Sequence, residues 1–484
     1  MDASNFVHLP ARTSLSDEKS PAPTYLIISG GTGANSFVSA FGSSPAFVLP
    51  VSDDGGSSAE ILRCFGGPSI GDIRSRLIRL IPLPEHPTTS EEKERLAIYN
   101  LMSHRFPIEV AEKILRDLWM QIVEGQSSLW DDIGRDKKEC IRAFLVQFQT
   151  LCLRRAHKQF SFRNFSIGNG FLTGARDFFG SLPSAIFLFK AVAGVEHGVR
   201  VIPVINTNHT VTIAARLADS TTLVGQCSIS HPAFPSATLA GSRVTSEIHA
   251  MSHLRHGSRR DSSTFDTSIP QSRRSSLDEY SPNLSGSGGN LGYRKGEDVV
   301  PLDARIEGVF YLNLYGQEVF PEPNPEFLET INSRDVLVYS CGSLWTSIVP
   351  CLALRGMATA IATSPSLRAK VVLLNTVNDR ETPDYTASDY ISGILDSLRH
   401  YDKPKRSDKG PLKSLWEARA LVTHVVCLEK AAVKVDETLK AMGIVIVRVP
   451  STIHGVSEGE TPLFTTQAVK WAMTRVMENL KEER

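Results

Sequence analysis

The stretch Tyr25–Arg76 constrains the fold more than any other part of the chain. It contains two continuous apolar runs, Tyr25–Ile28 and Phe47–Val51, and each ends in a loop of small and polar residues. Such runs are typical of strands that a parallel sheet buries on both faces. A helix is expected to begin near Ala34, and a third glycine-rich loop, from Gly66, opens another helix. The stretch therefore predicts a βαβ unit of the nucleotide-binding kind.

The loop after the first run has the glycines that such a unit uses. Glycines let the backbone approach a phosphate, and the helix that follows presents free N–H groups to it. Asp53 follows Gly33 at about the offset at which an acid meets a ribose hydroxyl. Ser36 replaces the third glycine of the usual pattern, so the turn alone does not distinguish phosphate binding from a structural role. With the other loops, it predicts a diphosphate cradle made by Gly30, Gly31, Thr32 and Gly33.

Strand and helix patterns alternate through the rest of the chain. The expected strands are Val199–Ile205, Gly308–Leu312, Val336–Tyr339, Lys370–Asn375, His424–Leu428 and Ile444–Val449, and the expected later helices are Ala387–His400, Lys430–Met442 and Thr466–Glu482. Pro203 places its strand at an edge or bulge. Val211–Leu217 and Thr221–Gln226 flank a short turn and predict a hairpin. The fold class is α/β, with a three-layer, doubly wound, mainly parallel sheet and a Rossmann-like core.

The domain organisation follows from composition. The expected parts are a disordered tail (1–23), one α/β domain (24–230 and 303–464) with a helical segment (90–158), a low-complexity disordered insert (231–302) and a C-terminal helix (465–484). The insert contains Arg259–Ser262 and Arg273–Ser276, which are shaped like sites for a basic-directed kinase or are chance products of a Ser- and Arg-rich linker. Such an insert favours a eukaryotic source.

Charge and cysteine content exclude several classes of function. The 52 basic and 52 acidic residues balance, which argues against nucleic acid as the main partner. The 7 cysteines are scattered with no zinc spacing, so reduced thiols are expected. The apolar region Leu182–Ile205 is interrupted by charged residues and does not predict a membrane span. We expect a cytoplasmic protein without a membrane partner. A homo-oligomer is compatible with the sequence.

Five strings, in this order, resemble the CofD/YvcK family of 2-phospho-L-lactate transferases and their relatives. They are Gly30–Gly33, Asp53–Ser58, Gly71–Arg74, Ser166–Asn169 and Gly342–Pro350. The resemblance covers most of 24–230 and 303–450. It implies a nucleotide or nucleotide-sugar ligand, in a eukaryotic, fungal-type member of the family. The CofD branch transfers a phospholactyl group from a guanylylated donor with the help of Mg²⁺, and the YvcK branch is thought to bind nucleotide sugars and regulate metabolism.

This sequence departs from the family pattern at three places. Ser29 replaces the first glycine of the turn, Cys341 stands where proline is usual, and the loop Asn375–Thr382 matches only in part. The second-substrate pocket is therefore not assigned by the resemblance.

Several candidate residues have two possible roles. Of Asp53 and Asp54, one is expected to hold hydroxyls and the other Mg²⁺, unless one of them caps the next helix. Arg74 either neutralises phosphate or pairs with Asp72, and Asn169 either contacts a ligand or caps its own helix. The catalytic candidates are Asp53, Asp54 and Arg74, with Asp54 as the Mg²⁺ ligand. The ligand-binding candidates are Gly30, Gly31, Thr32, Gly33, Gly55, Gly56, Ser57, Gly71, Asp72, Asn169, Gly342, Ser343 and Thr346.

Two functions are compatible with this pattern. The first is a transferase that acts on a nucleotide-conjugated small molecule, and the second is a non-catalytic nucleotide-sugar sensor. A dehydrogenase is less favoured, because no distinct catalytic domain follows the first unit. The glycine turn is not followed by a G-K-[ST] motif, and the Ser343 region is not G-x-S-x-G, which argues against a P-loop ATPase and a nucleophile-elbow hydrolase.

Overall fold

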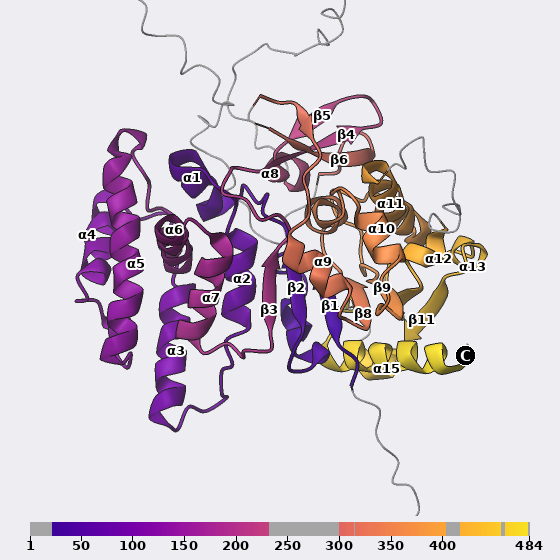
Figure 1. Ribbon diagram of the computed structural model, residues 1–484, viewed down its shortest axis with the longest axis horizontal. Coiled ribbons are helices and arrows are strands. Elements are labelled where there is room, and N and C mark those ends of the chain that lie inside the picture. Colours follow the sequence, from indigo (N-terminus) through magenta and orange to yellow (C-terminus); the bar gives the residue numbers. More distant parts are fainter. Residues whose placement is uncertain (1–21, 232–299, 314, 403–416, 456–459, 483–484) are drawn as a thin grey trace, which may run out of the picture.

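A seven-stranded parallel sheet, in the order β11-β10-β9-β8-β1-β2-β3, forms the centre of the computed structural model (Figure 1). The structure describes residues 22–231, 300–313, 315–402, 417–455 and 460–482. The strands are β1 (Tyr25–Ile28), β2 (Ala46–Leu49), β3 (Arg200–Pro203), β8 (Val336–Tyr339), β9 (Ala369–Leu373), β10 (His424–Leu428) and β11 (Val445–Val449). Helices flank this sheet, which confirms the predicted α/β, doubly wound fold. Pro203 lies in β3, at the edge of the sheet, as predicted.

The chain adds strands outward from β1 in both directions. β2 and β3 extend the sheet on one side, and β8 to β11 extend it on the other. Tyr25 pairs with Val336 of β8, and Leu26 pairs with Ala46 of β2. The loops after β1 and β8 therefore diverge at a topological switch point, where open α/β sheets bind their ligands.

A second, antiparallel sheet has the order β5-β4-β6-β7. Its strands are β4 (Thr212–Leu217), β5 (Thr222–Val224), β6 (Ile306–Leu312) and β7 (Glu318–Val319). The predicted hairpin is confirmed, but the placement of Gly308–Leu312 in the parallel sheet is wrong. Burial alternates along β6, as in a strand with one face turned away from the core. Figure 1 shows this sheet beside α8 (Gln226–Ser230), above β1 and β2.

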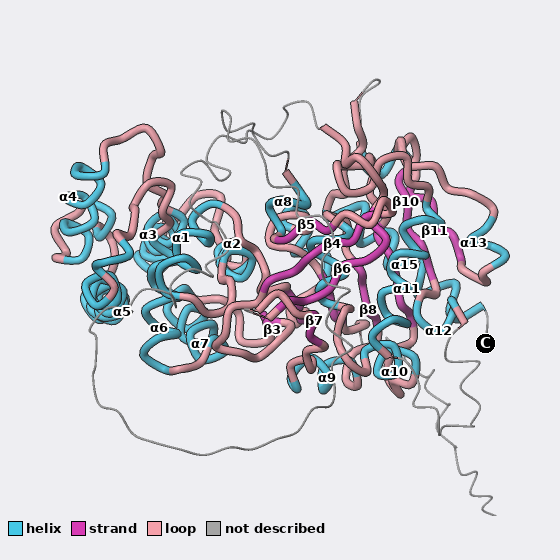
Figure 2. Tube along the Cα trace, turned by 90° about the horizontal axis from the view of Figure 1, so that it is seen from above, coloured by secondary structure: helices cyan, strands magenta, loops and turns pink. Residues whose placement is uncertain are grey.

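The first seven helices gather at the β3 end of the parallel sheet (Figures 1 and 2). They are α1 (Gly56–Phe65), α2 (Gly71–Arg79), α3 (Ser90–Ser103), α4 (Glu112–Val123), α5 (Arg135–Arg154), α6 (Ile167–Phe179) and α7 (Leu182–Ala193). Trp119, Trp130 and Phe148 are buried among them. The later helices are α9 (Pro325–Ile331), α10 (Met357–Ala362), α11 (Ala387–Tyr401), α12 (Ala418–Leu421), α13 (Thr438–Ala441), α14 (Ser451–His454) and α15 (Thr466–Glu482).

Two of the helices predicted from the sequence are wrong: one is a 3-10 segment, and the other is much shorter than predicted. The element after the glycine turn is a 3-10 segment, Asn35–Phe41, with a non-helical residue at Phe37. The predicted helix Lys430–Met442 is reduced to α13, because Ala432 and Val433 donate their backbone N–H groups to Thr376 instead of to a helix ladder. Tertiary hydrogen bonds override helix propensity at this position.

The predicted disordered tail and disordered insert lie mostly outside the described residues, which omit 1–21 and 232–299. Both kinase-like strings of the insert fall in the second of these ranges. Among the helices that the structure does describe, none has the length and apolar character needed to cross a bilayer.

Candidate functional site

A cavity of about 540 Å³ opens beside the loops that follow β1 and β2. It is lined by Thr32, Asp53, Gly55, Gly56, Ser57, Ser58, Gly71, Asp72, Arg74, Ser75, Arg105, Asn169 and His231. The first three glycine-rich loops therefore meet at one place, as the sequence predicts. Every lining residue is polar or glycine, so the cavity suits the charged part of a ligand.

Two carboxyl groups, those of Asp53 and Asp72, face this cavity. Asp53 accepts a hydrogen bond from the backbone N–H of Gly55 (3.1 Å). A Cβ atom on Gly71 would lie 2.2 Å from Asp53 Oδ2, so α2 begins in direct contact with this acid. Burial raises the pKa of Asp53, and burial together with the charge of Asp53 raises the pKa of Asp72 to about 7. The pair is poised to accept a proton or a cation.

Two arginines face the same cavity. Within the described part of the chain, the side chain of Arg74 makes no hydrogen bond and no ion pair, and its buried Nε has no partner. Burial and the charge of Arg105 lower the pKa of Arg74 to about 10. Arg105 donates to the carbonyl and to Oδ1 of Asn164 (2.8 and 3.0 Å). A buried guanidinium with donors to spare is a binding group for an anion such as phosphate.

Asn169 lies in the first turn of α6. Its Nδ2 donates to Ser57 Oγ (2.6 Å), while its Oδ1 is buried without a partner. The side chain therefore ties α6 to the start of α1 and does not cap its own helix. Its free carbonyl oxygen is available to a ligand that carries a donor.

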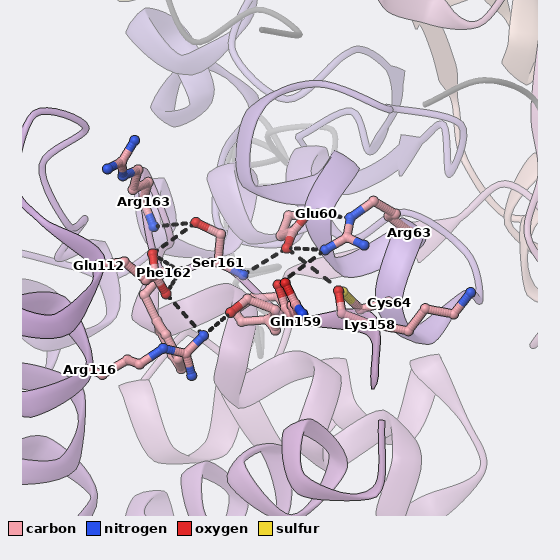
Figure 3. Close-up of polar contacts among 11 residues, drawn as sticks. Glu60, Arg63, Cys64, Glu112, Arg116, Lys158, Gln159, Ser161, Phe162 and Arg163 are labelled. Carbon is pink, nitrogen blue, oxygen red and sulfur yellow. Dashed lines mark hydrogen bonds and ion pairs between the residues drawn. The ribbon is translucent and has the colours of Figure 1, made fainter. Parts of the chain in front are cut away.

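The loop Gln159–Phe165, which presents Asn164 to Arg105, is fixed by two carboxylates (Figure 3). Glu60 accepts from the backbone N–H of Ser161 (2.7 Å), and Glu112 accepts from the Ser161 hydroxyl (2.9 Å). Arg105 itself pairs with Ser166 in an isolated bridge. These contacts hold the arginine beside the cavity.

The glycines of the first turn are packed against protein. A Cβ atom would lie 2.5 Å from Ser347 Oγ at Gly30, 2.4 Å from Asp72 Oδ1 at Gly31, and 2.6 Å from the Cys341 carbonyl oxygen at Gly33. Thr32 lines the cavity, and its three glycine neighbours let the loops after β1 and β8 and the start of α2 converge. Their contact with a diphosphate stays a prediction.

Gly33→Ala is expected to lower the free energy of unfolding by about 1–3 kcal/mol, the usual cost of overpacking. The new methyl group would meet a backbone oxygen, which has no side-chain freedom to move away. Thermal unfolding measures the change. Gly308→Ala is the matched control, because a Cβ there meets nothing within 4 Å; equal stability of the two variants would contradict the packing role.

Besides Gly30, Gly31 and Gly33, four more candidates lie outside the cavity lining. Asp54 Oδ1 accepts from the backbone N–H of Cys227 (2.8 Å), so it faces α8, while Asp53 faces the cavity. Gly342 exchanges two hydrogen bonds with Asn375, and Thr346 donates to Glu381. Ser343 precedes the irregular turn Leu344–Ile348. The hydrogen bonds of Asp54, Gly342 and Thr346 connect neighbouring segments of the protein. Contacts of these four residues with a ligand stay predictions.

Sequence reasoning missed Arg105 and His231, which line the cavity, and Arg76, which supports it. Arg76 is fully buried, donates to Ser29 Oγ and the Gly30 carbonyl (both 3.2 Å), and lies over the Phe47 ring. The four-residue spacing from Asp72 was a usable signal, because it places both side chains on one helix face. Arg105 and His231 reach the cavity only through long-range packing.

Comparisons with known proteins agree on one family. The family model described as 2-phospho-L-lactate transferase CofD matches residues 26–451. An uncharacterised Saccharomyces cerevisiae protein, YNL011C, is 34% identical over 431 residues, covering 86% of this chain and 92% of that protein. A gluconeogenesis factor of Halalkalibacterium halodurans is 40% identical over 75 residues, 16% of this chain and 23% of the factor. A UPF0052 family crystal structure from Bacillus halodurans has a TM-score of 0.54 at 20% identity, covering 94% of this chain and 99% of that one.

Proposed function

This chain belongs to the 2-phospho-L-lactate transferase CofD family, as a eukaryotic, fungal-type member, and from that premise we propose that it is a transferase. In the proposed reaction, a substituted phosphate group passes from a nucleotide-activated donor to a hydroxyl acceptor in the described cavity. The donor's phosphates lie between the Asp53–Asp72 pair and the Arg74–Arg105 pair.

The observation that carries this proposal is the unpartnered guanidinium of Arg74. Asp53 and Asp72 attract this guanidinium without forming an ion pair with it, and its buried Nε lacks an acceptor, whereas Arg76 and Arg176 donate to backbone carbonyls. A phosphate supplies the missing acceptors in the two-pronged geometry that a guanidinium prefers. The all-polar lining favours phosphate over a nucleobase at this position.

The residues fit the predicted Mg²⁺, although with a different ligand from the one expected. The described residues hold no cluster of three His, Cys, Asp or Glu side chains. Mg²⁺ commonly binds through one or two carboxylates and the substrate's phosphates, so Asp53 together with the donor's phosphates would suffice, which leaves Asp72 available as a base. Asp54 is engaged by α8. When bound, Mg²⁺ would neutralise phosphate charge.

The protein's own groups have separate roles in the proposed reaction. The acceptor hydroxyl attacks phosphorus and the bond to the nucleotide leaving group breaks, which releases a mononucleotide. Asp72, with its pKa of about 7, is suited to take the hydroxyl proton. Arg74 and Arg105 stabilise the charge that develops on the phosphate oxygens.

A nucleotide-sugar sensor is the second candidate. One of the relatives is named a gluconeogenesis factor, and the match between it and this chain is local. The same cavity would then bind a nucleotide sugar without a reaction. Tight binding of a nucleotide sugar without product formation would favour this function over the transferase.

The test is incubation of the purified protein and Mg²⁺ with guanosine and uridine diphosphate conjugates and a panel of small-molecule alcohols as acceptors, followed by chromatography for released mononucleotide. We expect release, and we expect Asp53→Asn to reduce its rate at least about 100-fold, since it removes a cavity carboxylate. Asp117→Asn, on the exposed face of α4, is the control. Absence of release with every conjugate would contradict the transferase.

A further inference from the structure

Two adjacent residues, Arg380 and Glu381, hold the segments that flank 232–299. Arg380 donates through Nε to the carbonyl of Ile229 (3.2 Å) and through Nη1 to the carbonyl of Val300 (2.5 Å). Ile229 belongs to α8, and Val300 is the first described residue after 299. One guanidinium therefore joins the two flanks directly.

Glu381 joins α8 to the loop after β8. Its carboxylate accepts from the hydroxyls of Ser230 (2.7 Å) and Thr346 (2.5 Å). It also accepts from the backbone N–H groups of Trp345 and Thr346 (3.0 and 3.1 Å). Glu381 is 1% exposed, so these four donors replace the water that its carboxylate has lost. Neither Arg380 nor Glu381 lines the cavity.

The helix that they hold touches the site at two points. The backbone N–H of Cys227, in the first turn of α8, donates to Asp54, the neighbour of Asp53. A Cβ atom on Gly225 would lie 2.5 Å from Asp54 Oδ2, so the start of α8 packs directly on that acid. His231, immediately after α8, lines the cavity. A shift of α8 would therefore move both the acid loop and a cavity wall.

We propose that Arg380 and Glu381 are positioning residues of the site: by fixing α8, they set the placement of Asp54 and His231. A helix of five residues has little stability of its own, so such outside contacts decide where it lies. This inference deepens the proposed function, since it names residues remote from the cavity on which binding there depends.

The test uses the full chain and the variants Ser230→Ala, Arg380→Gln and their combination. Hydrogen exchange with mass spectrometry reports on α8, and calorimetry with inorganic pyrophosphate and Mg²⁺ reports on the cavity. We expect faster exchange at Cys227 and, in the double variant, pyrophosphate binding weaker by about 10- to 100-fold, as for other outer-shell partners. Arg154→Gln, an exposed arginine at the end of α5, should change neither quantity.

Unchanged exchange in α8 would overturn the inference, and so would faster exchange with unchanged pyrophosphate affinity. Ser230→Ala removes one hydroxyl and keeps the test open if Arg380→Gln does not fold. If the wild-type protein binds no pyrophosphate, the proposed function fails separately. Exchange in the peptide 51–56, which contains Asp53 and Asp54, then decides the inference: faster exchange supports positioning, and unchanged exchange overturns it.

Discussion

Asp72→Asn is expected to slow turnover strongly and to stabilise the folded protein above neutral pH. Asp72 is one of two carboxyl groups at the cavity, and its amide analogue cannot take a proton as a carboxylate does. We expect the rate of mononucleotide release to fall by about 10²–10⁴-fold. The amide oxygen can still accept from the Gly31 backbone, so local geometry is retained.

The stability effect follows from the raised pKa of Asp72. Its pKa is about 7 in the folded protein and near the ordinary value of 3.8 when unfolded, so between these values the folded state binds more protons. Stability therefore falls as pH rises through this window, and the full cost remains above pH 7. Removing the charge should raise the free energy of unfolding at pH 8 by roughly 1–3 kcal/mol. At pH 4 the two proteins should be nearly equal.

Denaturant unfolding at pH 4, 6 and 8 measures this difference, with Asp117→Asn as the exposed control. A variant that loses activity and also loses stability at pH 8 would show that Asp72 is a structural carboxylate. Gain of stability with loss of activity is the usual signature of a functional group held in an unfavourable setting.

The sheet was predictable because its signal is local. The runs Tyr25–Ile28 and Val336–Tyr339 are apolar at every position, and only a strand buried on both faces needs that pattern. Small or polar residues follow both runs, and from them the ligand-binding loops were predicted to lie at one edge of the sheet. The strand Ile306–Leu312 was misplaced because its neighbour in the sheet lies across the long stretch 232–299, where sequence order no longer indicates pairing.

The site was predictable in outline only. Asp53 and Asp54 are adjacent in sequence, and a periodicity argument predicts that they diverge without saying which one reaches the cavity. The answer depends on Cys227, because its backbone N–H donates to Asp54 and thereby orients Asp54 toward α8. The glycine turn predicts a phosphate cradle, and the sequence did not indicate that Gly31 also packs against Asp72 and Gly33 against Cys341. Arg105 reaches the cavity through a bridge to Ser166, a contact that no local pattern encodes.

Arg74→Gln is expected to remove ligand binding without a loss of stability. The sequence allowed two roles for Arg74, a phosphate contact or a structural pair with Asp72. The two roles predict opposite effects of Arg74→Gln on the free energy of unfolding. The structure gives the Arg74 side chain no hydrogen bond or ion pair within the described residues, and burial lowers its pKa. A group whose folded pKa is lowered destabilises the folded state while it is charged. Its replacement by a neutral side chain should leave the melting temperature unchanged or raise it.

The affinity for a nucleoside diphosphate with Mg²⁺ should fall by about 10- to 100-fold in Arg74→Gln, because a charge-assisted bidentate contact is lost. Arg74→Lys restores the charge but not the planar guanidinium that binds phosphate through two hydrogen bonds, so it should recover only part of the affinity. Arg154→Gln, on the exposed end of α5, is the matched control for a lost arginine. Calorimetry and thermal unfolding on the same samples separate the two roles. A melting temperature that drops while affinity is retained would mean that Arg74 neutralises Asp72 and that phosphate binds elsewhere.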